Sequence, residues 1–108
     1  MTHSDRSVCP IARTLDLVGD RWTLLVLRDA LIFGRKSFAE FEASVERIPS
    51  NLLADRLKRL VEGGFLNKVA YQDKPVRYHY LPTKKARAAR PILRAMKQFG
   101  ETYLEEDE

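Results

Sequence analysis

The chain has 108 residues, which is the length of one domain, and its apolar content of 44% is enough for one modest core. One cysteine and two histidines are too few for an intramolecular disulfide or a usual zinc site, so we expect no cofactor. The net charge of +4 is concentrated in residues 35–90, where thirteen Lys and Arg stand against six Asp and Glu. This basic centre favours a polyanionic partner, although a solvated surface would have the same composition.

The N-terminal segment predicts a short helix. The opening stretch, MTHSDRSVCP, is polar, so we expect no secretory signal. Proline is favoured in the first helical turn, which places the start of the helix at Cys9-Pro10, and Gly19 ends it. Its apolar stripe consists of Ile11, Leu15 and Val18.

A second helix follows, with Asp20 as its N-cap. The segment RWTLLVLRDALIFG is apolar nearly all round, so we expect this helix to be the buried spine, with Trp22 in the core. Arg28 and Asp29 interrupt the apolar run, which is also too short to span a bilayer. We therefore expect a cytoplasmic protein with no membrane partner.

The next two helices are predicted to form a helix-turn-helix. Ser37 and Glu40 have the spacing of a capping box at the start of a helix over 37–45, which would bury Phe38, Phe41 and Val45. A turn of about four residues separates it from a helix over 50–62.

The helix over 50–62 has two contrasting faces. Its apolar stripe consists of Leu53, Leu57, Leu60 and Val61, and polar residues occupy the other side. Asn and Asp can hydrogen-bond base edges, so the candidate DNA-reading residues are Ser50, Asn51, Asp55, Arg56 and Arg59. Ordinary helix chemistry gives alternatives: capping for Ser50 and Asn51, an ion pair along the helix for Asp55, and solvation for the bases.

Alternating residues in FLNKVAYQDKPVRYHYL, with a turn signal at residues 72–75, predict a β-hairpin. A hairpin after a helix-turn-helix is the order of a winged helix, in which the second helix enters the major groove and the hairpin lies beside it. The candidate contacts to the DNA backbone are Lys36, Ser37, Lys58, Lys74 and Arg77. Charges that protect an edge strand are the alternative explanation for the last two.

The C-terminal segment predicts a long helix from Thr83 that Pro91 kinks or splits. Its apolar stripe, which is a candidate dimer contact, consists of Ile92, Met96, Phe99 and Tyr103. The stripe would otherwise cover only its own core.

Four segments, CPIARTLDLVGDRWTLLVLRDALIFG, SFAEFEAS, IPSNLLADRLKRLVEGGFL and YLPTKKARAARPILRAMKQFG, together resemble the HxlR family of bacterial winged helix-turn-helix transcriptional regulators. The resemblance covers about residues 8–104. It implies a homodimer that binds operator DNA and is assembled through residues 8–19 and 84–104. It also makes Cys9 a candidate redox or electrophile sensor, because some members sense such signals through an N-terminal cysteine.

We therefore expect residues 1–108 to form a single domain that is mainly α with a small β-hairpin. It would act as a homodimeric regulator on an inverted repeat in double-stranded DNA, with an unknown effector. A module that binds an acidic protein is the alternative. Cys9 precedes a helix, where the thiolate form is favoured, and an inert or packing thiol is the alternative. No catalytic set is recognisable, so we do not expect an enzyme.

Overall fold

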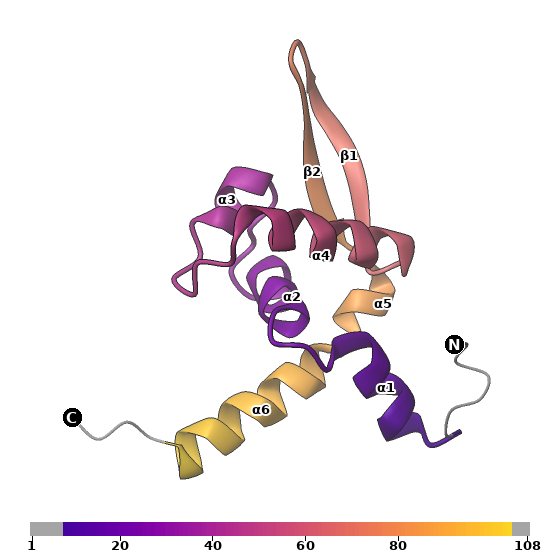
Figure 1. Cartoon of the computed structure of the whole chain (residues 1–108), viewed down its shortest axis with the longest axis vertical. Coiled ribbons are helices and arrows are strands. Elements are labelled where there is room, and N and C mark those ends of the chain that lie inside the picture. The colour runs from indigo at the N-terminus through magenta and orange to yellow at the C-terminus, as the bar shows by residue number, and fades with distance from the viewer. Residues whose placement is uncertain (1–7, 105–108) are drawn as a thin grey trace.

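The computed structural model describes residues 8–104. Within them the order is α1 (Pro10–Val18), α2 (Thr23–Leu31), α3 (Phe38–Glu42), α4 (Ser50–Glu62), β1 (Leu66–Asp73), β2 (Val76–Pro82), α5 (Lys84–Arg87) and α6 (Arg90–Tyr103). The two-stranded hairpin stands out from one end of the helical body, and α1 and α6 diverge at the other (Figure 1). The predicted fold, a mainly helical winged helix, is confirmed. The predicted single domain also includes residues 1–7 and 105–108, which lie outside the described residues.

The core forms between α2 and α4, whose apolar side chains belong to one buried cluster. Its most deeply buried large side chains are Leu27, Phe41, Leu53, Leu57 and Leu66. Full burial of such a side chain contributes roughly 1.5–3 kcal/mol. The expectation that α2 is the buried spine is therefore confirmed, and Trp22 packs against this core while remaining partly exposed.

Polar side chains begin α2 and α3. The carboxylate of Asp20 accepts hydrogen bonds from the backbone N–H groups of Trp22 (3.0 Å) and Thr23 (3.2 Å), so Asp20 caps α2 although the helix itself starts only at Thr23. The capping box is present: the Glu40 N–H donates to Ser37 Oγ (3.2 Å), and Glu40 Oε1 accepts from the Ser37 N–H (3.2 Å). These bonds satisfy N–H groups that a helix start leaves without partners.

The connection between α3 and α4 is longer than the sequence predicted. α3 ends at Glu42 rather than near residue 45, and residues 43–49 join it to α4. Val45, predicted to be in the core, is 82% exposed, because it lies in this connection and not on a helix. Ile48 takes its place as the buried apolar side chain.

Arg28 of α2 holds this connection in place. Its Nη1 and Nη2 donate to the two carboxylate oxygens of Glu46 (2.9 and 2.6 Å), and Nη2 also donates to Asp29 (2.9 Å) and Ser44 (3.2 Å). The hydrogen bonds from Arg28, and that from Ser44, lower the pKa of Glu46 to about 2, against the burial that opposes it. The connection that leads into α4 is thus fixed to the buried helix by a two-pronged ion pair.

The hairpin and the C-terminal helices complete the fold. β1 and β2 pair antiparallel from Leu66↔Pro82 to Asp73↔Val76, with an irregularity between Ala70 and Gln72. The Tyr80 N–H donates to the Lys36 carbonyl (2.8 Å), which attaches the hairpin to the residues before α3. Pro91 lies in the first turn of α6, so the predicted long helix is split into α5 and α6, as one of the two expected outcomes.

The Arg28–Glu46 pair generates a pH-dependent prediction. Glu46→Gln should lower the free energy of unfolding by about 1–2 kcal/mol at pH 7, because the charge of Glu46 is lost from a partly buried pair. The pKa of Glu46 is about 2 in the folded chain and 4.5 ordinarily, so its contribution is complete above about pH 5 and declines as the pH falls towards 2. Urea unfolding of both proteins from pH 7 to pH 3 would measure this.

The control is Glu101→Gln, which removes an exposed ion pair with Lys97 on α6. It should cost less than about 0.5 kcal/mol. A difference between wild type and Glu46→Gln that does not narrow below pH 4.5 would contradict the assignment.

Candidate nucleic-acid interface

α4 and the hairpin lie beside each other and present one continuous surface. α4 crosses the base of the hairpin in Figure 1, and β1 follows it after a turn at Gly63-Gly64. Gly64 has a φ of +83°, a conformation that suits glycine, and this sets the angle at which the hairpin leaves α4. The angle between α4 and the hairpin is therefore set by the backbone at Gly64.

A groove of about 420 Å³ separates α4 from the hairpin, and its lining includes Lys58 and Lys68. The Lys68 ammonium lies 4.3 Å from the ring centre of Tyr78, which orients it on the strand. Lys68 was not among the predicted contact residues. Alternation along β1 could have indicated an outward lysine, but only the fold places it opposite Lys58.

The first turn of α4 carries Ser50 and Asn51, both exposed. Pro49 is the N-cap of α4 and the helix start has no side-chain cap, so neither residue plays the capping role considered as the alternative. The Ser50 hydroxyl donates instead to a carboxylate oxygen of Glu42 at the end of α3 (2.5 Å).

Asp55 and Arg59 form the ion pair that was weighed as an alternative to DNA reading. Arg59 Nε lies 3.0 Å from Asp55 Oδ2, one turn back along α4, while the Arg59 side chain keeps 60% of its surface exposed. A surface pair of this kind contributes little to stability but fixes the direction of both side chains.

Arg56 has a different position from the one predicted. Its side chain is only 12% exposed, its Nε donates to Asp20 Oδ2 (2.9 Å), and its Nη1 donates to Asp55 (2.5 Å). It faces the start of α2 and is not exposed on the outward face as Asn51 and Arg59 are. Partial burial would raise the pKa of Asp20, but hydrogen bonds from Thr23, Arg56 and the Trp22 N–H hold that pKa well below its ordinary value.

The predicted backbone contacts lie at two places. Lys74 and Arg77 are exposed at the tip of the hairpin, where the Gln72 side-chain amide donates to the Pro75 carbonyl (3.0 Å) and closes the turn. Lys36 is exposed before α3, and Ser37 is half-buried with its hydroxyl already used by the capping box. With about 3.3 Å per strand residue, the tip lies roughly 20 Å from the hairpin base.

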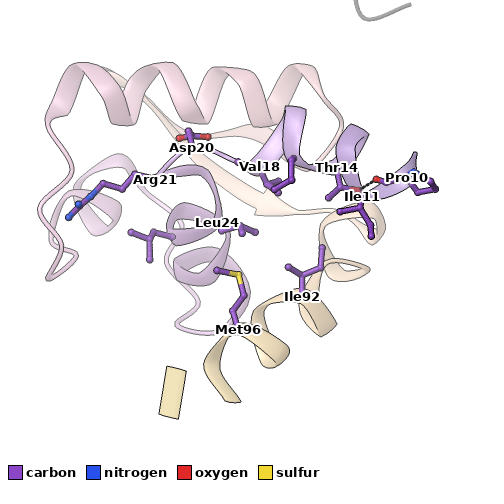
Figure 2. Close-up of a pocket in the computed structure, with 12 residues that line it drawn as sticks. Pro10, Ile11, Thr14, Val18, Asp20, Arg21, Leu24, Ile92 and Met96 are labelled. Carbon is purple, nitrogen blue, oxygen red and sulfur yellow. Dashed lines mark hydrogen bonds between the residues drawn. The ribbon is translucent and has the colours of Figure 1, made fainter. Parts of the chain in front are cut away.

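The opposite end of the molecule is apolar and open. α1, α2 and α6 surround a groove of about 700 Å³, whose lining includes Ile11, Leu15, Leu24, Ile92 and Met96 (Figure 2). Ile11 is 72% exposed and Phe99, one turn beyond Met96 on α6, is 58% exposed. Cys9, exposed and in no disulfide, is the N-cap residue of α1.

Comparison with known proteins agrees with this geometry. The profile of the HxlR-like helix-turn-helix proteins matches residues 17–108. The chain belongs to the HxlR family. The resemblance noted from the sequence is thereby confirmed, and the matched segment contains the whole helix-turn-helix, the hairpin and α6 of this HxlR-family chain.

Individual relatives differ in length from this family member. An uncharacterized HTH-type transcriptional regulator of Mycobacterium tuberculosis, Rv3095, is 38% identical over 94 residues, which are 87% of this chain and 58% of Rv3095. The chain thus spans little more than half of that relative. The crystal structure of PA1607, described as a candidate transcription factor, has a TM-score of 0.84 at 38% identity and covers 99% of this chain, which spans 73% of PA1607. The reduced form of the redox regulator HypR has a TM-score of 0.77 at 30% identity, covering 90% of this chain and 95% of HypR.

Two features are absent from residues 8–104. In that range no helix combines the length and the hydropathy needed to cross a membrane. The same residues include no group of three or more His, Cys, Asp and Glu side chains able to hold a metal ion.

Proposed function

We propose that this HxlR-family chain is a sequence-specific DNA-binding transcriptional regulator that acts as a homodimer on an inverted repeat. The observation that carries the proposal is the joint surface of α4 and the hairpin, on which polar and basic side chains are exposed side by side. A helix of thirteen residues with an exposed polar face fits the major groove, and the hairpin beside it reaches the flanking backbone.

The roles of the residues follow from their exposure. Ser50, Asn51 and Arg59 on the outward face of α4 contact base edges, with Asp55 orienting Arg59 or accepting from a cytosine amino group. The phosphate contacts come from Lys36, Ser37, Lys58, Lys74 and Arg77, to which the groove adds Lys68. Charge concentrated in residues 35–90 then supplies the salt-dependent part of the affinity.

The apolar groove supports the dimer. Large apolar side chains on α1 and α6 are exposed at the end of the molecule opposite the hairpin, where a second copy covers them without blocking α4 (Figure 1). A twofold dimer places two copies of α4 about 34 Å apart, or a multiple of that distance, along the DNA.

Selection of genomic fragments with the purified protein at moderate salt, read by sequencing, tests the proposal. An inverted repeat recovered upstream of a small set of genes is the expected result. A folded dimer that enriches no motif would contradict it and would favour a module that binds an acidic protein.

Asn51→Ala tests base reading. We expect it to weaken binding to the selected repeat by about tenfold or more, because one bidentate base contact is worth about 1–3 kcal/mol, and to leave binding to random DNA nearly unchanged. Fluorescence anisotropy with both DNAs would measure this.

Lys74→Ala is the matched control at the hairpin tip. It should weaken binding to both DNAs to a similar degree and reduce the slope of log affinity against log salt by about one. Equal losses on both DNAs for Asn51→Ala would refute its role in reading bases.

Phe99→Glu tests the dimer. A charge on the exposed apolar face of α6 should shift the chain to a monomer in analytical ultracentrifugation and abolish cooperative binding to the repeat. Val45→Glu alters a more exposed apolar side chain, in the connection between α3 and α4, and should leave the dimer intact. A dimer that tolerates Phe99→Glu would move the interface elsewhere.

We further propose that Cys9 makes DNA binding redox-sensitive. It is exposed at the start of α1, next to the dimer surface, and HypR, a redox regulator, has the same fold. Diamide would oxidise two thiols to a disulfide, either between the two copies of Cys9 or, with added glutathione, as a mixed disulfide. Diamide should change the affinity of the wild type for the repeat and leave Cys9→Ser unaffected; an equal response of both would exclude Cys9.

A further inference from the structure

The carboxylate of Asp20 joins two parts of the molecule that the sequence separates. It caps α2 through the N–H groups of Trp22 and Thr23, and it also accepts from Arg56 Nε (2.9 Å), a residue of α4 that is 36 positions away. In Figure 2, Asp20 lies directly beneath α4, with α1 leading into it. The Asp20 side chain therefore connects the joint between α1 and α2 to α4.

The same joint determines where α1 lies. Val18 is the buried residue of α1, and most of the helix is exposed, so its own packing against the body is slight. Gly19 closes the helix so tightly that an added Cβ would lie 2.4 Å from the Leu15 carbonyl oxygen. α1 is consequently attached to the body mainly at Gly19 and Asp20, and both of these residues line the apolar groove.

From Arg56 the connection continues to the exposed face of α4. Arg56 Nη1 donates to Asp55 Oδ2 (2.5 Å), and the same oxygen lies 3.0 Å from Arg59 Nε in an ion pair. Arg59 is the only one of these four side chains with more than half of its surface exposed. The chain of contacts thus begins at the wall of the groove and ends at a side chain that faces outward.

We propose that Arg56 is a positioning residue, which sets the discrimination between DNA sequences by tying α4 and its Asp55–Arg59 pair to the α1–α2 joint, without contacting DNA. The proposal rests on the proposed DNA-binding function. Its regulatory consequence is that a displacement of α1, by whatever covers the groove, reaches the recognition helix through Asp20.

Geometry explains why such a tie affects specificity more than affinity. Bidentate hydrogen bonds to a base tolerate only small changes in distance and angle, whereas phosphate contacts by long side chains adapt. A recognition helix that loses its anchor retains the phosphate contacts and loses discrimination. A direct contact of Arg56 with a phosphate would have the opposite signature, because a charge would leave the interface.

Two variants distinguish these cases. Arg56→Gln removes the charge, and Asp20→Asn retains an acceptor for the cap of α2 while ending the ion pair with Arg56. Each should lower the ratio of affinity for the selected repeat to that for random DNA by about tenfold, with an unchanged salt slope. The double variant should be no worse than either single one, because both remove the same contact. Lys58→Gln, which removes an exposed charge of α4 that belongs to none of these contacts, is the matched control; it should reduce the salt slope by about one and leave the ratio nearly unchanged.

The opposite results would overturn the proposal. If Arg56 binds DNA, Asp20→Asn frees it and strengthens binding to both DNAs, and Arg56→Gln reduces the salt slope by about one. If Asp20→Asn does not fold, Arg56→Lys replaces it, since lysine cannot hold Asp20 and Asp55 together; an unchanged ratio in that variant refutes the positioning role.

A readout without DNA separates this inference from the proposed function. In ¹⁵N spectra, Arg56→Gln should shift the amide signals of residues 18–23 as well as those of α4, and leave Lys74 at the hairpin tip unchanged. A wild type that discriminates no DNA sequence contradicts the proposed function, whereas amide shifts confined to α4 contradict the coupling.

Discussion

The burial of α2 is the constraint on which the rest of the structure depends. Leu27 is fully inaccessible, and α2 contacts α1, α4, the hairpin, α5 and α6, so each of these elements is positioned against one helix. Burial of this helix also brings polar side chains into the interior. Each of them needs a hydrogen-bonding or charged partner, because an unpaired buried charge is costly in free energy. Arg28 and Asp20, at two points along this segment, find theirs in the connection before α4 and in α4 itself. Burial of apolar side chains therefore supplies most of the stability. The ion pairs of Arg28 and Asp20 determine how α4 is oriented against α2.

Two ion pairs therefore hold α4 in position. Glu46 fixes the chain just before α4, and Arg56 fixes its second turn, both to the α2 segment. Apolar packing alone leaves a helix some freedom to slide or rotate, whereas hydrogen-bonded ion pairs on two sides define a single position. A surface that is already ordered loses less conformational entropy when it binds, so the two pairs would favour the DNA binding proposed for α4.

Local chemistry made much of the fold predictable. The capping box at Ser37, the hairpin turn and the split at Pro91 each depend on a few neighbouring residues, and all appear in the structure. The failures involve distant partners. Val45 fits the helical period of α3. However, Arg28 donates hydrogen bonds to Ser44 and Glu46, on either side of Val45, and these bonds hold the segment as a connection. Arg56 lies at the edge of the apolar stripe by its spacing, and no local pattern indicates that its partner is Asp20. The period of apolar and polar residues along a helix does not indicate an ion pair between residues 36 positions apart.

In α1 and α6, the residues that pack against the body differ from the apolar residues that the two helices expose. Val18 and Leu93 are the buried side chains of these helices, while the large apolar residues on their other faces contribute little to the core of the protomer. Substitutions on those faces can accumulate with little effect on folding. In the proposed dimer, the same faces can diverge until each chain recognises only its own copy, while the scaffold that presents α4 stays unchanged. Partner choice and foldability are thus encoded in different residues.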